Sequence, residues 1–282
     1  MGTSSSGNGP RPKTPLIPSW IPGGMPDAPP PPPRDEEEDD KPQGNPEPTV
    51  PPNENRYKQS KVNFKKFVKS KGTKNDYANR ALRDYVKTSG GGSTVLARRM
   101  KPSAVRVAQF YDILTGFRQE GTTESLKHLN LDEYTNKGVV DILSSLMDIV
   151  FSNANATFEN TQDDSITKQS YANTINRIAD EGDIDLDNLS AENIDIMTSI
   201  FIEETISTRV ICDIGASINK VLTDPNDILE VENNVYQIVS GLVRNSIMSE
   251  LLATRQIQQS EIEIIFEKIY RIAFDSITGE LN

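Results

Sequence analysis

The chain has almost no cysteine or histidine. Its 282 residues contain one of each, Cys212 and His128. A single cysteine excludes an internal disulfide, and the pair cannot supply the ligand set of a structural zinc site. His128 has no Ser, Cys or paired carboxylate close by in sequence. Cys212 follows two apolar residues, where a small buried side chain of the core is expected, so both residues are interpreted as structural. We therefore expect no catalytic residue, no metal and no cofactor.

Long apolar runs are also missing. No stretch of about 18 apolar residues occurs, which argues against a membrane-spanning helix. The N-terminus lacks the basic-then-apolar order of a secretory signal. Together with the scarcity of cysteine, this predicts a soluble protein of the reducing cytoplasm with no membrane partner.

Charge divides the chain into three parts. The net charge of −11 combines −4 over residues 1–52, +12 over residues 53–118 and −19 over residues 119–282. A basic segment of this kind faces either an anionic partner or the acidic part of its own chain. The sequence leaves both alternatives open.

Residues 1–52 are rich in Gly, Ser and Pro and include the acidic run Asp35–Asp40. They have too few large apolar residues to offset the loss of chain entropy, so a long disordered N-terminal arm is predicted. Its one apolar island is Pro15–Pro22. There the prolines restrict the backbone while Leu16, Ile17 and Trp20 supply apolar surface beside Pro18, a composition typical of a docking peptide.

Residues 53–282 show helical spacing of apolar residues and predict one mostly helical body, so the fold class is all-α. Tyr57, Phe64 and Phe67 form one such stripe, which ends at Gly72. Ser190 and the pair Asp224-Pro225 are typical helix starts. Residues 256–264 alternate in part, so a short strand is the alternative to a helix there.

Several candidate binding motifs have ordinary alternatives. The glycine-rich stretch 87–94 can present backbone N–H groups to a phosphate, but it lacks the P-loop order and is better interpreted as an interhelix turn. Arg98, Arg99, Lys101 and Arg106, with the lysines of 58–74 and more broadly the basic segment 53–106, can follow a nucleic-acid backbone. A solvated or self-paired basic face is the commoner arrangement. Residues 183–187 are faintly like a calcium loop, but an acidic turn is the better interpretation.

The N-terminus carries the sharpest chemical signal. Met1-Gly2 favours methionine removal, which leaves an unhindered glycine amine with a pKa of about 8. Gly2 with Ser6 also fits the myristoylation pattern, and the leader additionally has a tag-like appearance. The residues alone leave these three interpretations open.

Several segments in this order resemble the QatB family, a component of the bacterial Qat anti-phage defence system. They are Met1–Gly7, Thr14–Trp20, Arg56-Tyr57, Asn63–Phe67, Tyr85–Ser93 and Ala97–Met100. The resemblance is strong over residues 1–120 and thin beyond. It implies an operon with an ATPase (QatA), a TatD-like nuclease (QatD) and QatC, which is similar to the deazaguanine-synthesis enzyme QueC.

Enzymes like QueC adenylate a deazaguanine carboxylate and let an amine displace AMP. The resemblance therefore implies that the QatC-like partner joins a 7-deazaguanine to Gly2 through an amide. The residues expected to thread or dock on that partner are Thr3, Ser4, Ser5, Ser6, Gly7, Leu16, Ile17, Pro18 and Trp20. A non-catalytic acceptor subunit is the favoured function. The alternatives are an unmodified scaffold, a nucleic-acid-binding subunit and an N-myristoylated adaptor.

Overall fold

The computed structural model describes residues 57–88, 92–152, 162–181, 184–254 and 262–279. The predicted arm, residues 1–52, lies outside them. Every regular element within these ranges is an α-helix or a short 3₁₀ helix, and none is a strand, which confirms the all-α class. No helix within these ranges combines the length and apolarity needed to cross a membrane.

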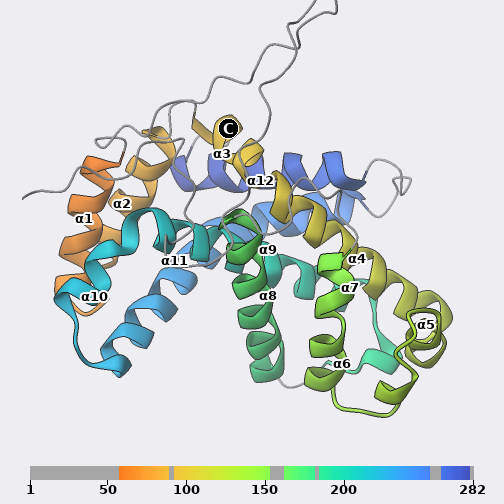
Figure 1. Ribbon diagram of the computed structural model, residues 1–282. Helices are drawn as coiled ribbons and strands as arrows, with labels where there is room; N and C mark the ends of the chain where they lie inside the picture. The colour runs from red at the N-terminus through yellow and green to blue at the C-terminus, as the bar shows by residue number, and fades with distance from the viewer. Residues whose placement is uncertain (1–56, 89–91, 153–161, 182–183, 255–261, 280–282) are drawn as a thin grey trace, which may run out of the picture. The chain divides into compact units, whose positions relative to one another are not determined.

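Figure 1 shows the order of the helices along the chain by colour. The first half contains α1 (Lys58–Lys69), α2 (Asn75–Lys87), α3 (Gly92–Arg99), α4 (Lys101–Glu120), α5 (Thr122–His128), η1 (Asp132–Tyr134), α6 (Val139–Ser145) and α7 (Met147–Ser152). The second half contains α8 (Gln162–Glu181), η2 (Leu186–Asn188), α9 (Ala191–Ile214), η3 (Gly215–Ser217), α10 (Ile218–Val221), α11 (Pro225–Thr254) and α12 (Ile262–Thr278). The part of residues 256–264 that the structure describes is therefore helical, and the alternative of a strand is wrong there.

The turn between α1 and α2 depends on glycine, as the sequence predicts. Gly72 has a φ of +79°, a left-handed conformation that favours glycine. A Cβ at this position would also lie 2.7 Å from the side-chain nitrogen of Asn234 on α11. This close approach lets the antiparallel pair α1 and α2 pack near α11.

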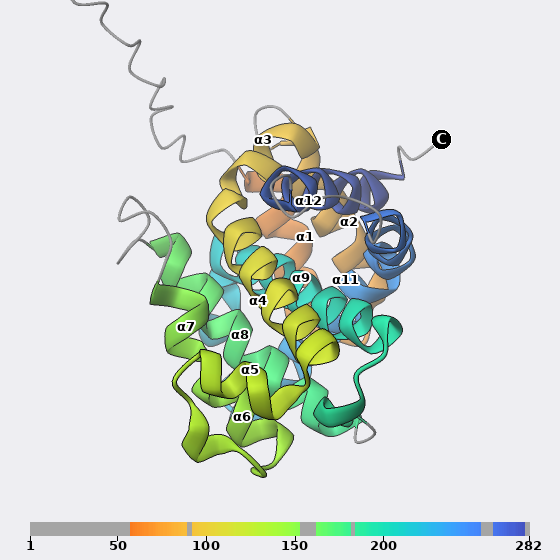
Figure 2. The same ribbon diagram turned by 90° about the vertical axis from the view of Figure 1, so that its right-hand side faces the viewer.

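Helix α9 lies at the centre of the described body, in contact with α8, α11 and α4 (Figure 2). It begins at a capping box, in which Ser190 Oγ accepts from the backbone N–H of Asn193 and the Asn193 side chain accepts from the N–H of Ser190. Helix α9 has buried residues on nearly all of its sides, because the neighbouring helices cover most of its circumference. Helix α12 covers α3, α4, α2 and α11 from one side.

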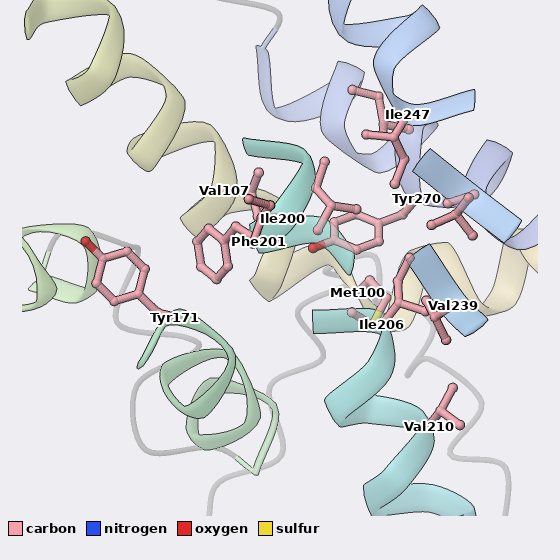
Figure 3. Close-up of a cluster of buried hydrophobic side chains, with 14 of the residues drawn as sticks. Met100, Val107, Tyr171, Ile200, Phe201, Ile206, Val210, Val239, Ile247 and Tyr270 are labelled. Atoms are coloured by element: carbon pink, nitrogen blue, oxygen red, sulfur yellow. The ribbon is translucent and has the colours of Figure 1, made fainter. Parts of the chain in front are cut away.

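The core joins side chains from α4, α9, α11 and α12 (Figure 3). Phe201 on α9 meets the rings of Phe110 and Tyr171 edge to face, at centroid separations of 5.6 and 5.3 Å. Tyr270 on α12 is fully buried, and its hydroxyl lies 2.6 Å from Thr205 Oγ1 on α9. Each buried aromatic ring contributes about 1.5–3 kcal/mol, so this cluster fixes how the central helices pack.

Candidate functional site

The site residues predicted in the arm lie outside the described residues. This applies to Gly2, to Thr3–Gly7 and to Leu16, Ile17, Pro18 and Trp20. Their predicted roles stay predictions. Of the Gly-rich stretch 87–94, the structure describes Lys87 and Thr88 at the end of α2 and the residues from Gly92, where α3 begins.

The basic segment separates into inward-facing and outward-facing cations. Arg106 on α4 is 1% exposed and lies 3.3 Å from Asp164 Oδ1 on α8. It also donates to the carbonyl of Val150 at 3.0 Å and lies over the Phe151 ring. Arg106 thus holds α4, α7 and α8 together and is not available to a partner.

Arg99 also faces the acidic part of its own chain. Its guanidinium lies 3.3 Å from Asp213 Oδ2 on α9 and donates to the Tyr57 hydroxyl at 2.7 Å. The same carboxylate accepts from the Tyr85 hydroxyl at 2.8 Å and pairs with Arg209. Burial, reinforced by Asp213, raises the pKa of Tyr85 well above its ordinary value, so the phenol keeps its proton and donates. For Arg99 and Arg106, the self-paired alternative is correct.

The cations of α1, α2 and their connecting turn face outward. Those exposed are Lys58, Lys61, Lys65, Lys66, Lys69, Lys71, Lys74, Arg80, Arg83 and Lys87. Within the described part of the chain, only Lys71 among them is ion-paired, at 2.9 Å from Asp227. This pair is open to solvent and contributes little. The helical pair therefore presents a positively charged surface, which we call the α1–α2 basic surface.

A hollow of about 400 Å³ crosses the α1–α2 basic surface. Its lining residues are Gln59, Asn63, Lys66, Arg80, Arg83, Asp84 and Lys87. The three from α1 and the four from α2 are spaced by three or four residues, so each set forms one stripe of its helix. Asp84, the one acidic group of this lining, accepts a hydrogen bond from Asn63 Nδ2 at 2.8 Å. Four cations thus face one engaged carboxylate.

A second hollow adjoins the first at the α1–α2 turn. It is lined by Thr73, Lys74, Asn75, Asp76, Tyr77 and Arg80 and has a volume of about 440 Å³. Arg80 lines both hollows. Lys66, from the first hollow, lies over the Tyr77 ring with its ammonium 5.5 Å from the ring centroid. An aromatic face therefore adjoins the cations, a feature that the sequence alone does not reveal.

A third hollow, of about 530 Å³, lies among α8, α9 and α11. Its Glu204 carboxylate is bound by Arg177 and by Asn173 Nδ2, and Arg177 stacks on Tyr236 at 3.5 Å. Tyr236 in turn donates to the buried Glu203 at 2.9 Å. These polar groups bond one another and join three helices.

Cys212 lines this third hollow and is exposed, contrary to the expectation of a buried small side chain. Two residues on a helix turn about 200°, so Cys212 faces the hollow although Val210, two positions earlier, is fully buried. Partial burial, followed by the nearby Asp213, raises the pKa of the thiol, which keeps it protonated and weakly nucleophilic. Its structural interpretation as part of the core is wrong.

The remaining sequence candidates are surface features. His128 is exposed, with Nδ1 3.1 Å from Glu120 Oε2. Asp185 caps the short helix η2 by accepting from the backbone N–H of Asp187 at 2.9 Å, which supports an acidic turn. Among the described residues, no group of three or more His, Cys, Asp or Glu is arranged to hold a metal ion.

Comparison with known protein families gives a match that extends well beyond residue 120, where only a thin resemblance is expected from the sequence. A family model described as QatB, Qat anti-phage system associated protein, matches residues 91–277, more than half of the chain. Helices α1 and α2 precede the matched stretch. No curated protein and no solved structure matches the chain.

Proposed function

The chain belongs to the QatB family of Qat anti-phage system associated proteins, and we propose that it is the non-catalytic acceptor subunit of that system. In this proposal, a QueC-like partner, QatC, joins a 7-deazaguanine to the N-terminal amine of Gly2. The observation that carries the proposal is the Met1-Gly2-Thr3-Ser4-Ser5-Ser6-Gly7 leader in a chain of this family. QatA and QatD are proposed as further partners.

The chemistry favours Gly2 over the lysines of the body. An adenylated carboxylate is attacked by a neutral amine, and AMP leaves as the amide bond forms. An N-terminal amine has a pKa of about 8, whereas a lysine has one of about 10.4. At neutral pH the lysine is therefore about two to three orders of magnitude less deprotonated. Glycine is also the least crowded residue.

The body's internal polar groups are consistent with a non-catalytic role. In the third hollow, Glu204, Arg177 and Tyr236 are engaged with each other or with Glu203 and hold helices together. The Cys212 thiol has a raised pKa, which does not favour a nucleophile. The body is thus proposed to present the arm and to bind partners.

Intact mass spectrometry of the chain co-expressed with its operon tests the acceptor role. We expect loss of Met1 and an added deazaguanine-sized mass on the N-terminal peptide, dependent on active QatC. Gly2→Leu removes the adduct because a bulky second residue retains Met1, whereas Thr3→Ser retains it. A Gly2 that is unmodified beside active QatC contradicts conjugation and leaves the scaffold function. A fatty-acylated Gly2 supports the myristoylated adaptor instead.

Docking of the apolar island is tested separately with Trp20→Ala. Burial of one tryptophan contributes about 1.5–3 kcal/mol, so affinity for QatC should fall about tenfold or more. Calorimetric titration measures this loss, with Pro29→Ala as the control outside the island. Equal affinity of the Trp20→Ala and control chains excludes the docking role.

Nucleic-acid binding is a second candidate function. The observation that favours it is the α1–α2 basic surface, whose cations other than Lys71 have no acidic partner within the described residues. Such a surface binds phosphates with a steep dependence on salt. A labelled oligonucleotide whose affinity does not change between about 50 and 200 mM salt would exclude this function.

A further inference from the structure

We propose that the α1–α2 basic surface binds a single-stranded nucleic acid, with a phosphate in the first hollow and the neighbouring base on Tyr77. The inference rests on the second candidate function and specifies its ligand and its residues. It also removes Arg99 and Arg106 from the binding segment, because their guanidinium groups pair internally with Asp213 and Asp164.

The first hollow has the features of a phosphate site. Lys66 reaches it from α1, and Arg80, Arg83 and Lys87 reach it from α2. Arginine side chains present paired N–H donors that match phosphate oxygens, and lysine supplies a mobile point charge. Asp84 in this hollow accepts a hydrogen bond from Asn63, and Asp76 lies in the adjoining second hollow, so five cations face two carboxylates over the two hollows. An anion with several oxygens is therefore the fitting ligand.

The second hollow distinguishes nucleic acid from an acidic polypeptide. Tyr77 is half-buried, and its ring lies below the Lys66 ammonium at 5.5 Å from the centroid. Lys66 and Arg80 connect this ring to the phosphate hollow. A groove of cations with an adjacent aromatic face is the arrangement that binds unpaired bases, and stacking requires a base outside a duplex. An acidic peptide uses the cations but has no need of the ring.

Four lysines of α1 extend the positively charged surface beyond these hollows. Lys58, Lys61, Lys65 and Lys69 are exposed on this helix, and the described residues contain no acidic partner for them. These side chains can follow the backbone of a longer strand without reading its sequence. We therefore expect binding that tolerates different sequences and weakens with salt.

Fluorescence anisotropy with the full chain tests this proposal. The probes are labelled oligothymidylate and oligouridylate of about 20 nucleotides, longer than the roughly 4–16 that a small binding fold covers. A duplex of the same length is the comparison. We expect the single strands to bind more tightly than the duplex. Replacing Arg83 and Lys87 together by Glu should weaken binding at least about tenfold and reduce the salt slope by about 1.4 for two lost contacts.

Control variants distinguish the effect of the local charge from that of the Tyr77 ring and from a loss of stability. Arg118→Glu reverses one positive charge on an exposed residue of α4, half the charge change of the double variant, and should leave affinity unchanged. Tyr77→Leu should weaken single-strand binding about fivefold or more, whereas Tyr77→Phe, which keeps the ring, should not. Because Tyr77 packs partly on the core, both variants are compared at equal helicity and melting temperature.

Each remaining outcome overturns a stated part of the proposal. If replacing Arg83 and Lys87 by Glu does not weaken binding, the nucleic acid binds outside the first hollow. Only the second candidate function then remains. If the duplex binds as tightly as the single strands and Tyr77→Leu does not change the affinity, stacking of an unpaired base on Tyr77 is excluded. Displacement of the oligonucleotide by polyglutamate at equal charge concentration assigns the surface to an acidic polypeptide.

The acidic run Asp35–Asp40 of the chain is the last control, because it is a potential competitor. A chain with these six residues replaced by Ser should bind at least as tightly as the natural one. If only the chain with the serine replacements binds the oligonucleotides, the proposal stands, and Asp35–Asp40 competes with nucleic acid for the α1–α2 basic surface. If neither chain binds any probe, both the proposal and the second candidate function fail, while conjugation of Gly2, measured by mass, is unaffected.

Discussion

At the residue scale, ionisable side chains inside the body act as connectors. Asp164 is 2% exposed and lies within 3.3 Å of Arg106 and 3.1 Å of Lys168. A buried charge needs a partner, because water no longer solvates it. The two ends of the Arg106–Asp164 pair are 58 residues apart, so their contact forms only when α4 packs on α8.

Asp164→Ala should destabilise the body by about 3–5 kcal/mol, because it leaves the buried Arg106 without its carboxylate. Arg106→Met should cost less, since Asp164 keeps Lys168 and the methionine retains much of the volume. Asp180→Ala, on the exposed end of the same helix, is the control and should change stability by no more than about 0.5 kcal/mol. Urea unfolding followed by circular dichroism measures all three. Equal effects of Asp164→Ala and the control would exclude a structural role for the pair.

Several buried tyrosines of the described body have raised pKa values, namely Tyr85, Tyr171, Tyr236 and Tyr270. Burial is the main cause in each. These phenols bind their protons more tightly in the folded than in the unfolded chain, so their contribution to stability is complete below pH about 10 and is lost as the pH rises beyond it. We expect unfolding in this alkaline range, with part of the tyrosinate absorbance appearing only on unfolding. Full tyrosinate absorbance in a still-helical protein would contradict this expectation.

At the element scale, Glu203 joins α9 to α11. It is fully buried, and its two oxygens accept from Ser199, Tyr236 and two nitrogens of Arg244 at 2.8–2.9 Å. The Arg244 side chain is 41% exposed, so the carboxylate is deeper than its cation. Loss of Arg244 therefore leaves the buried Glu203 carboxylate without its cation.

Arg244→Leu should cost roughly 2–3 kcal/mol, below the usual range for a fully buried pair because water screens the exposed guanidinium. Adding Glu203→Leu should recover most of that loss, since both charges are then removed. The exposed Lys268–Glu250 pair, at 2.7 Å, is the control, and Lys268→Leu should cost less than about 1 kcal/mol. Thermal or urea unfolding measures each chain. Strictly additive single effects would show that the two residues do not interact.

The sequence predicts helix starts and stops better than their packing. Gly72 and Ser190 mark helix boundaries through local backbone chemistry, and both predictions are confirmed. The burial of Glu203 is not predictable from its apolar neighbours, because its partner Arg244 is 41 residues away. The same limit applies to the candidate surface. Composition indicates a basic segment, but only the packing of α3 and α4 shows that Arg99 and Arg106 face inward.

At the scale of the whole molecule, the charge division of the sequence has two structural outcomes. Part of the basic segment pairs with the acidic helices, as Arg99 and Arg106 show. The α1–α2 basic surface remains exposed and lies before the stretch that matches the family model. We therefore expect this surface and the residue 1–52 arm to act as separable functions on one helical body.

The single tryptophan of the chain, Trp20, lies in the arm and makes this separation measurable. A chain beginning at residue 53 should melt within about 2 °C of the full chain, because a contact of 1 kcal/mol already shifts a body of this size by about 2–4 °C. Trp20 emission in the full chain should stay that of a solvated indole through the helical transition and move to shorter wavelength when QatC is added. Far-ultraviolet circular dichroism provides the independent signal of the body. A blue-shifted Trp20 that is released together with the helices, or a markedly lower melting temperature of the shortened chain, would show instead that the arm packs on its own body.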